Sequence, residues 1–109
     1  MNRYIGTDLE PQFEKTDNAA TNKYGHFVWQ RYASPVWMDI DPTDVLEYEG
    51  ARDQHDERHI CPLQLGTIER CIKLWSNRGE TVLDPFSGIG SVAYEALIHD
   101  RKAIGIELK

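Results

Sequence analysis

A tight, glycine-containing connection between a short apolar run and an amphipathic segment constrains the fold of this chain more than any other feature. The run T-V-L at 81–83 is typical of a buried strand, and it leads into D-P-F-S-G-I-G-S at 84–91. A helix is expected over about 91–99, and a second short strand over 103–106, closed by Glu107. The helix residues expected to face inward are Val92, Ala93, Ala96 and Leu97. Strand, helix and strand in this order predict a parallel pair inside an α/β sheet.

An amphipathic helix is predicted immediately before this unit. Pro62 suits the first position of a helix, where its missing N–H has no cost. Apolar residues three and four apart then form one face: Leu65, Ile68, Ile72 and Trp75, with Cys71 beside them. Glu69 and Lys73 lie four apart in the order that favours an ion pair on the outer face. The run N-R-G at 77–79 ends the helix, since Gly79 suits a left-handed cap.

The first half of the chain differs in charge and in pattern. The 109 residues carry a net charge of -6, and residues 1–57 hold twelve acids against five Lys and Arg. Little regular structure is expected over 1–25, where aliphatic residues are few. The aromatic stretch 27–37 is expected to form one short strand or an apolar strap that covers another surface. In the acidic segment that follows, we predict a short helical turn capped by Thr43.

Composition limits the class of protein. Apolar residues make up 40% and charged residues 28%, which is typical of a globular chain. No apolar run approaches the roughly 20 residues of a membrane-spanning helix, and no basic-then-apolar leader opens the sequence, so we expect no membrane association. The excess of acids argues against a nucleic-acid binder that relies on its own basic surface. Cys61 and Cys71 are too few for a disulfide scaffold, and we expect reduced thiols in a cytoplasmic protein.

The glycine loop has the features of a ligand-binding site. Gly88 and Gly90 allow the backbone to approach a ligand closely, and the following helix directs its free N–H groups to the same place. Glu107 follows the next strand, where parallel sheets place a carboxylate for ribose hydroxyls. No Lys follows the glycines, as a P-loop requires. Ala93 replaces the third glycine of the strict dinucleotide pattern, although the relaxed pattern tolerates alanine.

Asp84 favours one class of ligand. At the start of the loop, its carboxylate attracts a cationic group and repels a pyrophosphate. A nucleoside with a positive centre and no phosphate therefore fits better than a dinucleotide, which is disfavoured but not excluded. We expect S-adenosylmethionine as the cofactor. The alternative is a plain tight connection between strand and helix, with Glu107 as a solvated strand end.

Three segments together resemble the DNA amino-methyltransferases, which form N6-methyladenine or N4-methylcytosine. The loop at 84–91 resembles their cofactor motif, and H-I-C-P-L-Q-L at 59–65 is similar to the motif placed just upstream in the permuted, beta-type order. G-I-E-L-K at 105–109 resembles the motif whose acid holds the ribose. The likeness covers about residues 52–109. The aromatic region and the segment from Ala51 onward are also similar to phage and prophage members.

This resemblance implies a partial Rossmann-like α/β methyltransferase fold, with 51–109 as its cofactor-binding part and 1–50 as an irregular acidic and aromatic arm. The residues it places around the methionine and adenosine of the cofactor are Asp84, Pro85, Phe86, Gly88 and Gly90. It implies that Glu107 accepts hydrogen bonds from the ribose hydroxyls. His59 and Pro62 are implied near the methionine end, and packing or capping at the helix entry is the alternative role for His59.

The base-holding motif of these enzymes has only a partial counterpart. The family uses a polar residue, two prolines and an aromatic residue, which hold the amino group and stack on the flipped base. The string S-P-V-W at 34–37 has the polar residue, one proline and the aromatic residue, but Val36 replaces the second proline. Only 21 residues separate Trp37 from His59, where the beta-type order needs several strands and a DNA-reading segment. The catalytic candidates are Ser34, Pro35 and Trp37, and a buried aromatic turn is the alternative.

Two further groups of residues have side chains that could bind a metal ion or nucleic-acid bases. His55 and His59 lie four apart among acids, but position 56 is Asp, so the zinc-protease pattern fails. A solvated charged loop is expected there, with no metal. The aromatic and Arg side chains of 27–37 can stack on bases in principle, but the acidic surroundings favour an interior or interface cluster.

The sequence therefore predicts an S-adenosylmethionine-dependent methyltransferase acting on amino groups of DNA. The chain carries few of the strands that the resemblance implies for a complete sheet, so we expect a truncated carboxy-terminal segment. The alternative is a non-catalytic cofactor-binding remnant, or a partner subunit of a fuller methyltransferase. Exposed strand faces are expected to pair with a second copy of the chain or with the missing methyltransferase part.

Overall fold

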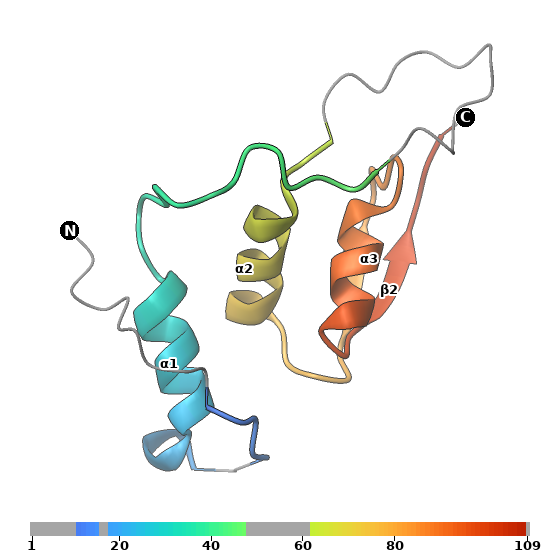
Figure 1. Ribbon diagram of the computed structural model, residues 1–109. Helices are drawn as coiled ribbons and strands as arrows, with labels where there is room; N and C mark the ends of the chain where they lie inside the picture. Colours follow the sequence, from blue (N-terminus) through green and yellow to red (C-terminus); the bar gives the residue numbers. More distant parts are fainter. Residues whose placement is uncertain (1–10, 16–17, 48–61, 109) are drawn as a thin grey trace. The chain divides into compact units, whose positions relative to one another are not determined.

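The computed structural model of this chain describes residues 11–15, 18–47 and 62–108 (Figure 1). Its elements are a 3-10 helix η1 (Ala19–Thr21), α1 (Lys23–Tyr32), α2 (Leu65–Trp75), β1 (Thr81–Asp84), α3 (Ser91–Ile98) and β2 (Lys102–Gly105). They belong to two compact units, Met1–Met38 and Asp39–Lys109. The domain boundary predicted between 50 and 51 lies outside the described residues and stays a prediction. No helix in the described part of the chain is long and apolar enough to cross a membrane.

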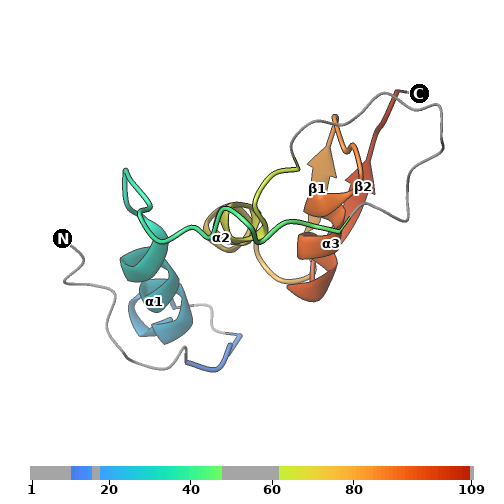
Figure 2. The same ribbon diagram turned by 45° about the horizontal axis from the view of Figure 1, so that its top comes forward.

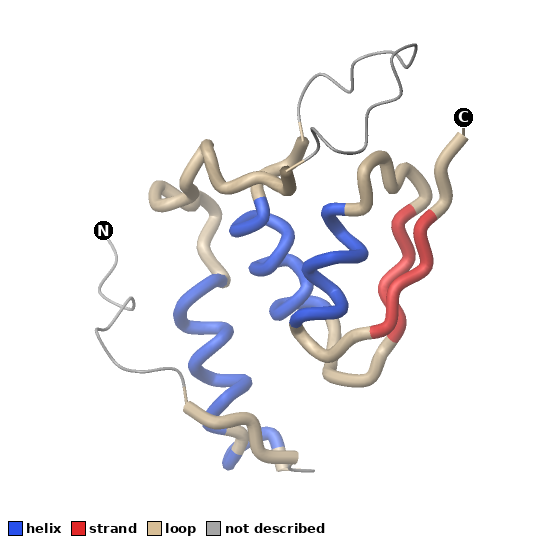
Figure 3. Tube along the Cα trace, turned by 45° about the vertical axis from the view of Figure 1, so that its right-hand side comes forward, coloured by secondary structure: helices blue, strands red, loops and turns tan. Residues whose placement is uncertain are grey.

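In the second unit, β1 and β2 form a parallel two-stranded sheet with Leu83 opposite Ile104 and Asp84 opposite Gly105. The connecting helix α3 lies against one face of the sheet (Figures 2 and 3). The prediction of a parallel pair within an α/β unit is confirmed. Its boundaries differ by one residue, because β2 starts at Lys102 and α3 ends at Ile98.

The core of this unit lies where α2, α3 and one sheet face meet. Ile68 and Ile72 are buried on α2, and Ala96 on α3 is completely inaccessible. The partly buried residues packed around them are Leu65, Val82, Val92 and Ala103. The predicted spacing of α2 is thus confirmed at Ile68 and Ile72. The predicted pair of Glu69 and Lys73 is also present, at 2.9 Å, but it does not lie on an outer face, because the Lys73 side chain is only 7% exposed.

The other face of the sheet is open within the described residues. Side chains alternate between the two faces of a strand, so Leu83 and Ile104 point away from the core formed by their neighbours. These two cross-strand partners are 59% and 53% exposed. Parallel sheets are normally covered on both faces. One side of this α/β unit is therefore packed, whereas the other presents aliphatic side chains to solvent.

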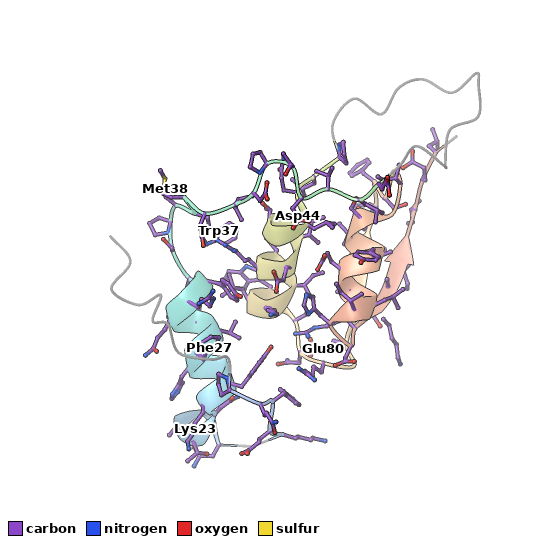
Figure 4. All side chains as sticks on the ribbon, in the orientation of Figure 1. Lys23, Phe27, Trp37, Met38, Asp44 and Glu80 are labelled. Atoms are coloured by element: carbon purple, nitrogen blue, oxygen red, sulfur yellow. The ribbon has the colours of Figure 1, made fainter. Side chains whose placement is uncertain are left out.

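Both ends of α2 differ from the prediction. Pro62 is not the first helical residue, because the helix begins at Leu65, whose N–H donates to the carbonyl oxygen of Asp44 at 2.8 Å. Asp44 lies beside this end of α2 in Figure 4. Trp75 was expected in the core but is 77% exposed, and Cys71 is exposed as well. Both residues line an apolar groove of about 340 Å³ beside β1, which no described residue fills.

The turn between α2 and β1 contains the predicted left-handed glycine, but in a different role. The helix already ends at Trp75, and the capping residue Ser76 is extended, whereas Gly79 has a φ of +83°. The Gly79 N–H donates to the carbonyl oxygen of Asp100 at 2.7 Å. The Glu80 carboxylate accepts from the backbone N–H of Asn77 at 2.7 Å and from its side chain at 3.0 Å (Figure 4). Gly79 therefore shapes the entry to β1 rather than the helix cap.

On α3, the inward face is shifted from the predicted one. Ala96 is buried as predicted, but Leu97 is 64% exposed. Glu95, which the apolar pattern did not place inside, is 4% exposed. The buried face of α3 therefore includes Glu95 and Ala96, and Leu97 lies outside it.

In the first unit, the prediction of a strand over 27–37 is wrong, because residues 23–32 form α1. The alternative, an apolar strap that covers another surface, stays a prediction. The Asn22 side chain caps this helix by accepting from the Gly25 N–H at 2.7 Å. Val28 and Tyr32, four residues apart, are its buried residues. Helical capping and spacing thus override the β preference of the aromatic residues. The expectation of little regular structure over 1–25 is likewise wrong where η1 and the start of α1 fall within it.

Thr43 does not cap a helical turn. The Asp41 carboxylate accepts from the Thr43 N–H at 2.8 Å and from its hydroxyl at 2.7 Å, and these bonds lower the pKa of Asp41. Residues 44–47 contain no helix. The aspartate therefore organises this turn, as short acidic side chains commonly do, and the hydroxyl of Thr43 acts as a donor.

Candidate cofactor-binding site

The glycine loop bends sharply between β1 and α3. Gly88 has a φ of +49°, and Gly90, with a φ of +90°, is the left-handed residue from which α3 begins. The Gly90 N–H donates to the carbonyl oxygen of Ser87 at 2.7 Å and closes the turn. Because L residues with a side chain rarely adopt these conformations, both positions favour glycine.

Backbone hydrogen bonds fasten the loop to the segment that follows β2. The Ile106 N–H donates to the carbonyl oxygen of Asp84 at 2.8 Å, and the Ser87 N–H donates to the carbonyl oxygen of Ile106 at 2.9 Å. The Gly88 N–H donates to Oε2 of Glu107 at 2.6 Å. The loop and the predicted ribose-binding acid therefore lie together at the carboxyl ends of the two strands.

A pocket of about 330 Å³ opens beside the loop. Its lining residues are Pro62, Leu63, Ile68, Asp84, Phe86, Ser87, Gly88, Ile89, Ser91 and Val92. The volume falls within the range of small-molecule sites, roughly 300–1,000 Å³. The walls are mainly apolar, and the polar groups come from the loop and the first turn of α3. This combination suits a ligand with an apolar body and a few polar groups.

Four of the eight predicted cofactor residues line this pocket: Pro62, Asp84, Phe86 and Gly88. Pro85 and Gly90 belong to the same loop but not to the lining. Glu107 contacts the loop from the side of β2 through Gly88. His59 lies outside the described residues.

Three lining residues of the loop were not singled out from the sequence. Ser87, Ile89 and Ser91 lie between or directly after the predicted residues of the motif. Ser91 is the first residue of α3 and is only 7% exposed. Their position inside the loop motif was the available signal, because the lining includes the consecutive residues 86–89 and not the glycines alone.

The electrostatic character of the loop comes from two carboxylates and a helix amino terminus. Oδ1 of Asp84 accepts from the Phe86 N–H at 3.0 Å, which leaves its second oxygen for a ligand. Glu107 likewise uses Oε2 for Gly88. The first turn of α3, whose Ser91 and Val92 line the same pocket, adds a positive potential. The arrangement suits a molecule that carries both a cationic centre and hydroxyl donors.

The Phe86 ring stands at the mouth of the pocket and is 88% exposed. An aromatic side chain this open is costly to hydrate and offers a flat apolar face to a planar ring system. Among the described residues, no group of His, Cys, Asp and Glu is arranged to hold a metal ion. The His55 and His59 pair lies outside those residues.

The catalytic candidates form a turn after α1, in the unit Met1–Met38. The Ser34 hydroxyl donates to the carbonyl oxygen of Val36 at 2.8 Å, and the Trp37 indole N–H donates to the carbonyl oxygen of Tyr32 at 2.8 Å (Figure 4). Trp37 is half-buried, Pro35 is exposed, and Val36 is 61% exposed. The glycine loop belongs to the other unit, Asp39–Lys109.

A buried acid that the apolar pattern did not reveal lies on α3. Oε2 of Glu95 is 3.1 Å from Nε2 of His99, and Oε1 of Glu69 is 3.7 Å from the same nitrogen. Burial raises the pKa of Glu95 to about 7, and the negative charges of Glu69 and Asp44 act in the same direction. The i, i+4 spacing of Glu95 and His99 was the only sequence signal for this pair.

The curated relatives that this chain matches are type II methyltransferases. The chain is 28% identical over 100 residues to the type II methyltransferase M.MthZI of Methanothermobacter thermautotrophicus. This alignment covers 89% of this chain and 27% of the relative. It is 33% identical over 75 residues to M.BamHI of Bacillus amyloliquefaciens (69% of this chain, 16% of the relative). It is 37% identical over 71 residues to M.BglI of Bacillus subtilis (65% and 20%). The chain thus spans little more than a quarter of these relatives at most.

No solved structure matches the chain significantly. The family model described as DNA methylase, of the N6/N4 class, matches residues 2–109. This match covers the first unit as well as the glycine loop and the acid after β2. Almost the entire sequence therefore follows the family pattern, and the chain belongs to the N6/N4 DNA methylase family.

Proposed function

We propose that this chain is the cofactor-binding segment of a methyltransferase that modifies exocyclic amino groups of adenine or cytosine in DNA. The observation that supports this most is the pocket at the glycine loop, where Asp84 lines the cavity and Glu107 holds the amide of Gly88. Membership in the N6/N4 DNA methylase family points to the same chemistry. The proposed ligand of the pocket is S-adenosylmethionine.

The residues of the loop have separate roles in this proposal. Asp84 faces the cationic end of the cofactor, and Phe86 offers its exposed ring to the planar base. Glu107 keeps Oε2 on Gly88 and uses its second oxygen for the ribose hydroxyls. Pro62 closes the pocket from the side of α2. His59, Pro85 and Gly90 complete the proposed set, with Gly90 holding the bend and His59 near the methionine end.

When bound, the sulfonium supplies the methyl group that the amino nitrogen of the target base attacks. The chain's own contribution is to hold and orient: its carboxylates fix the sugar and the charged end, and the apolar wall excludes water. Ser34, Pro35 and Trp37 remain proposed contacts to the flipped base. Their roles in holding the amino group and stacking on the ring follow from the family resemblance.

We also propose that a complementary methylase segment completes the fold. The matched portion is at most 27% of the relatives' length, and the aliphatic face at Leu83 and Ile104 is uncovered in the described part of the chain. A helix of the complementary segment would cover this face, since parallel sheets are covered on both sides. Sedimentation of the purified chain tests this against self-pairing: a monomer agrees with it, and a dimer abolished by Leu83→Lys contradicts it.

The order of the segments supports the permuted, beta-type arrangement, because the helix with its upstream His-x-x-Pro precedes the glycine loop. We also propose a phage or prophage origin, because the amino-terminal part is similar to phage and prophage members of the family. A cytoplasmic location is proposed together with the function, because it follows from membership in the DNA methylase family.

Titration calorimetry of the chain with S-adenosylmethionine tests the cofactor assignment. We expect heat of binding in the wild type and a loss of about tenfold in affinity for Asp84→Asn, because a charge-assisted contact is removed. Asp100→Asn is the matched control, since Asp100 pairs with Arg78 away from the pocket. The absence of heat in the wild type would refute the assignment.

Transfer of a labelled methyl group to DNA separates an enzyme from a non-catalytic remnant or partner subunit. Incorporation that disappears in Ser34→Ala supports a catalytic role for the 34–37 turn. Cofactor binding without incorporation supports the alternative, in which the chain contributes the cofactor site to a fuller methyltransferase.

A further inference from the structure

Gly105, the last residue of β2, lies directly behind the glycine loop. A Cβ at this position would lie 2.9 Å from Cβ of Ser87 and 3.0 Å from its Oγ, and no other described atom beyond its chain neighbours would come within 4 Å. Gly79, Gly88 and Gly90 have positive φ, whereas Gly105 does not. Any residue can therefore adopt the backbone conformation of Gly105, and only the short distance to Ser87 requires glycine at this position.

Ser87 cannot yield by a side-chain rotation alone. Its Cβ is fixed to the backbone, and that backbone is held on both sides of the residue. The Ser87 N–H donates to the carbonyl oxygen of Ile106 at 2.9 Å, and the Ser87 carbonyl oxygen accepts from the Gly90 N–H at 2.7 Å. A methyl group at Gly105 must therefore displace the loop itself, because contacts this short do not occur between real Cβ atoms.

Displacement of Ser87 would carry Gly88 with it. Gly88 is the residue whose N–H donates to Oε2 of Glu107, at 2.6 Å. Ser87 and Gly88 also line the pocket. The space left by the missing side chain of Gly105 thus controls both the shape of the pocket wall and the contact between the loop and Glu107.

We propose that Gly105 is a positioning residue for the cofactor loop: its missing Cβ allows Ser87 to lie against β2, which holds Gly88 on Glu107. The inference rests on the proposed function where it concerns the cofactor, and it goes beyond it by assigning a role to a residue outside the pocket. Gly105 touches no ligand in this proposal and acts only through Ser87.

The test is a double-mutant cycle of Gly105→Ala and Ser87→Gly. Ser87→Gly removes both atoms that the new methyl group would meet, so the double variant regains the space that Gly105→Ala loses. We expect Gly105→Ala to bind S-adenosylmethionine about tenfold more weakly, and the double variant to return to within about twofold of Ser87→Gly.

A second measurement does not depend on the cofactor. Hydrogen exchange of the Gly88 amide, followed by NMR on the free chain, reports its bond to Glu107. We expect faster exchange in Gly105→Ala and recovery in the double variant. Gly66→Ala is the matched control, because a Cβ there would lie at an ordinary 3.7 Å from Cδ1 of Ile40, and it should change neither measurement.

The outcomes separate this inference from the proposed function. If the wild type binds S-adenosylmethionine, and Gly105→Ala changes neither this affinity nor the exchange of the Gly88 amide, the inference alone is overturned. A wild type that binds no S-adenosylmethionine overturns the proposed function and the cofactor part of the inference together. If Gly105→Ala does not fold, a folded double variant supports the contact with Ser87, whereas a double variant that also fails to fold overturns it.

Discussion

The carboxylate of Glu107 accepts a hydrogen bond from the backbone N–H of Gly88, nineteen residues earlier in the chain, at 2.6 Å. The contact joins the segment after β2 to the loop after β1. Both lie at the carboxyl ends of parallel strands, the edge at which open α/β sheets bind ligands. One oxygen of Glu107 therefore shapes the loop, and the proposed function assigns the other oxygen to a ligand hydroxyl.

Replacing Glu107 by Gln should weaken cofactor binding more than it weakens the fold. The amide keeps the size of the side chain but loses the charge that strengthens the bonds to Gly88 and to hydroxyl groups. We expect a loss of about tenfold in affinity for S-adenosylmethionine, measured by calorimetry. Glu80→Gln is the control, because Glu80 bonds Asn77 at the other end of β1. Equal affinity losses in the two variants would contradict a specific role for Glu107.

Ile72→Ala should strongly destabilise the second unit. Ile72 is 5% exposed and packs in the cluster with Ile68 and Ala96. Truncation of such a side chain leaves a cavity and costs about 2–5 kcal/mol of unfolding free energy. Urea denaturation measures the loss. Leu97→Ala, at a residue that is 64% exposed, should change stability by only about 0.5 kcal/mol, and a similar cost at both sites would argue against the described core.

Arg101→Met should destabilise the second unit, because Arg101 links the carboxyl ends of α2 and α3 by hydrogen bonds. The buried guanidinium donates to the Ser76 carbonyl oxygen at 2.6 Å, to the Ser76 hydroxyl at 3.1 Å and to the carbonyl oxygen of His99. Losing a charged donor to partly buried acceptors costs about 2–3 kcal/mol. Arg78→Met is the control, because Arg78 pairs with Asp100 in exposed positions, where an ion pair contributes about 1 kcal/mol or less. Thermal unfolding of both variants gives the comparison.

The stability of the second unit should fall as pH rises through the range in which Glu95 ionises. The pKa of Glu95 is raised from 4.5 to about 7, mainly by burial. Between about pH 4.5 and 7, the folded state retains a proton that the unfolded state has already released. The contribution of Glu95 to the free energy of unfolding therefore decreases as the pH rises through this range. The measurement is the thermal midpoint at about pH 5.5 and about pH 7.5.

Glu95→Gln should flatten this dependence, because the amide does not titrate. The groups that face Glu95 are His99 on its own helix, Glu69 and Lys73 on α2, and Asp44. The exposed Glu47 provides the control, and Glu47→Gln should retain the wild-type slope. A Glu95→Gln variant with the wild-type slope would assign the dependence to another group.

Local patterns in the sequence predicted most of the second unit. Four-residue spacing located the buried face of α2 at Ile68 and Ile72, and the short apolar runs located β1 and β2. The same patterns failed for α1, where Asn22 and the spacing of Val28 and Tyr32 outweighed an aromatic composition typical of strands. They also failed at Trp75 and Leu97, because spacing assigns a helix face but not what lies in front of it.

By itself, the sequence determined the order of helix, strand, glycine loop, helix and strand, because each of these depends on residues close together in the chain. It also singled out Gly88 and Gly90, as glycines in a tight strand-to-helix connection, and Glu107, as an acid directly after the second strand. Only the tertiary structure decided that Glu107 lies on Gly88 and that Gly105 must leave room for Ser87. Those contacts join residues 18 and 19 positions apart, and parallel strand pairing alone brings them together.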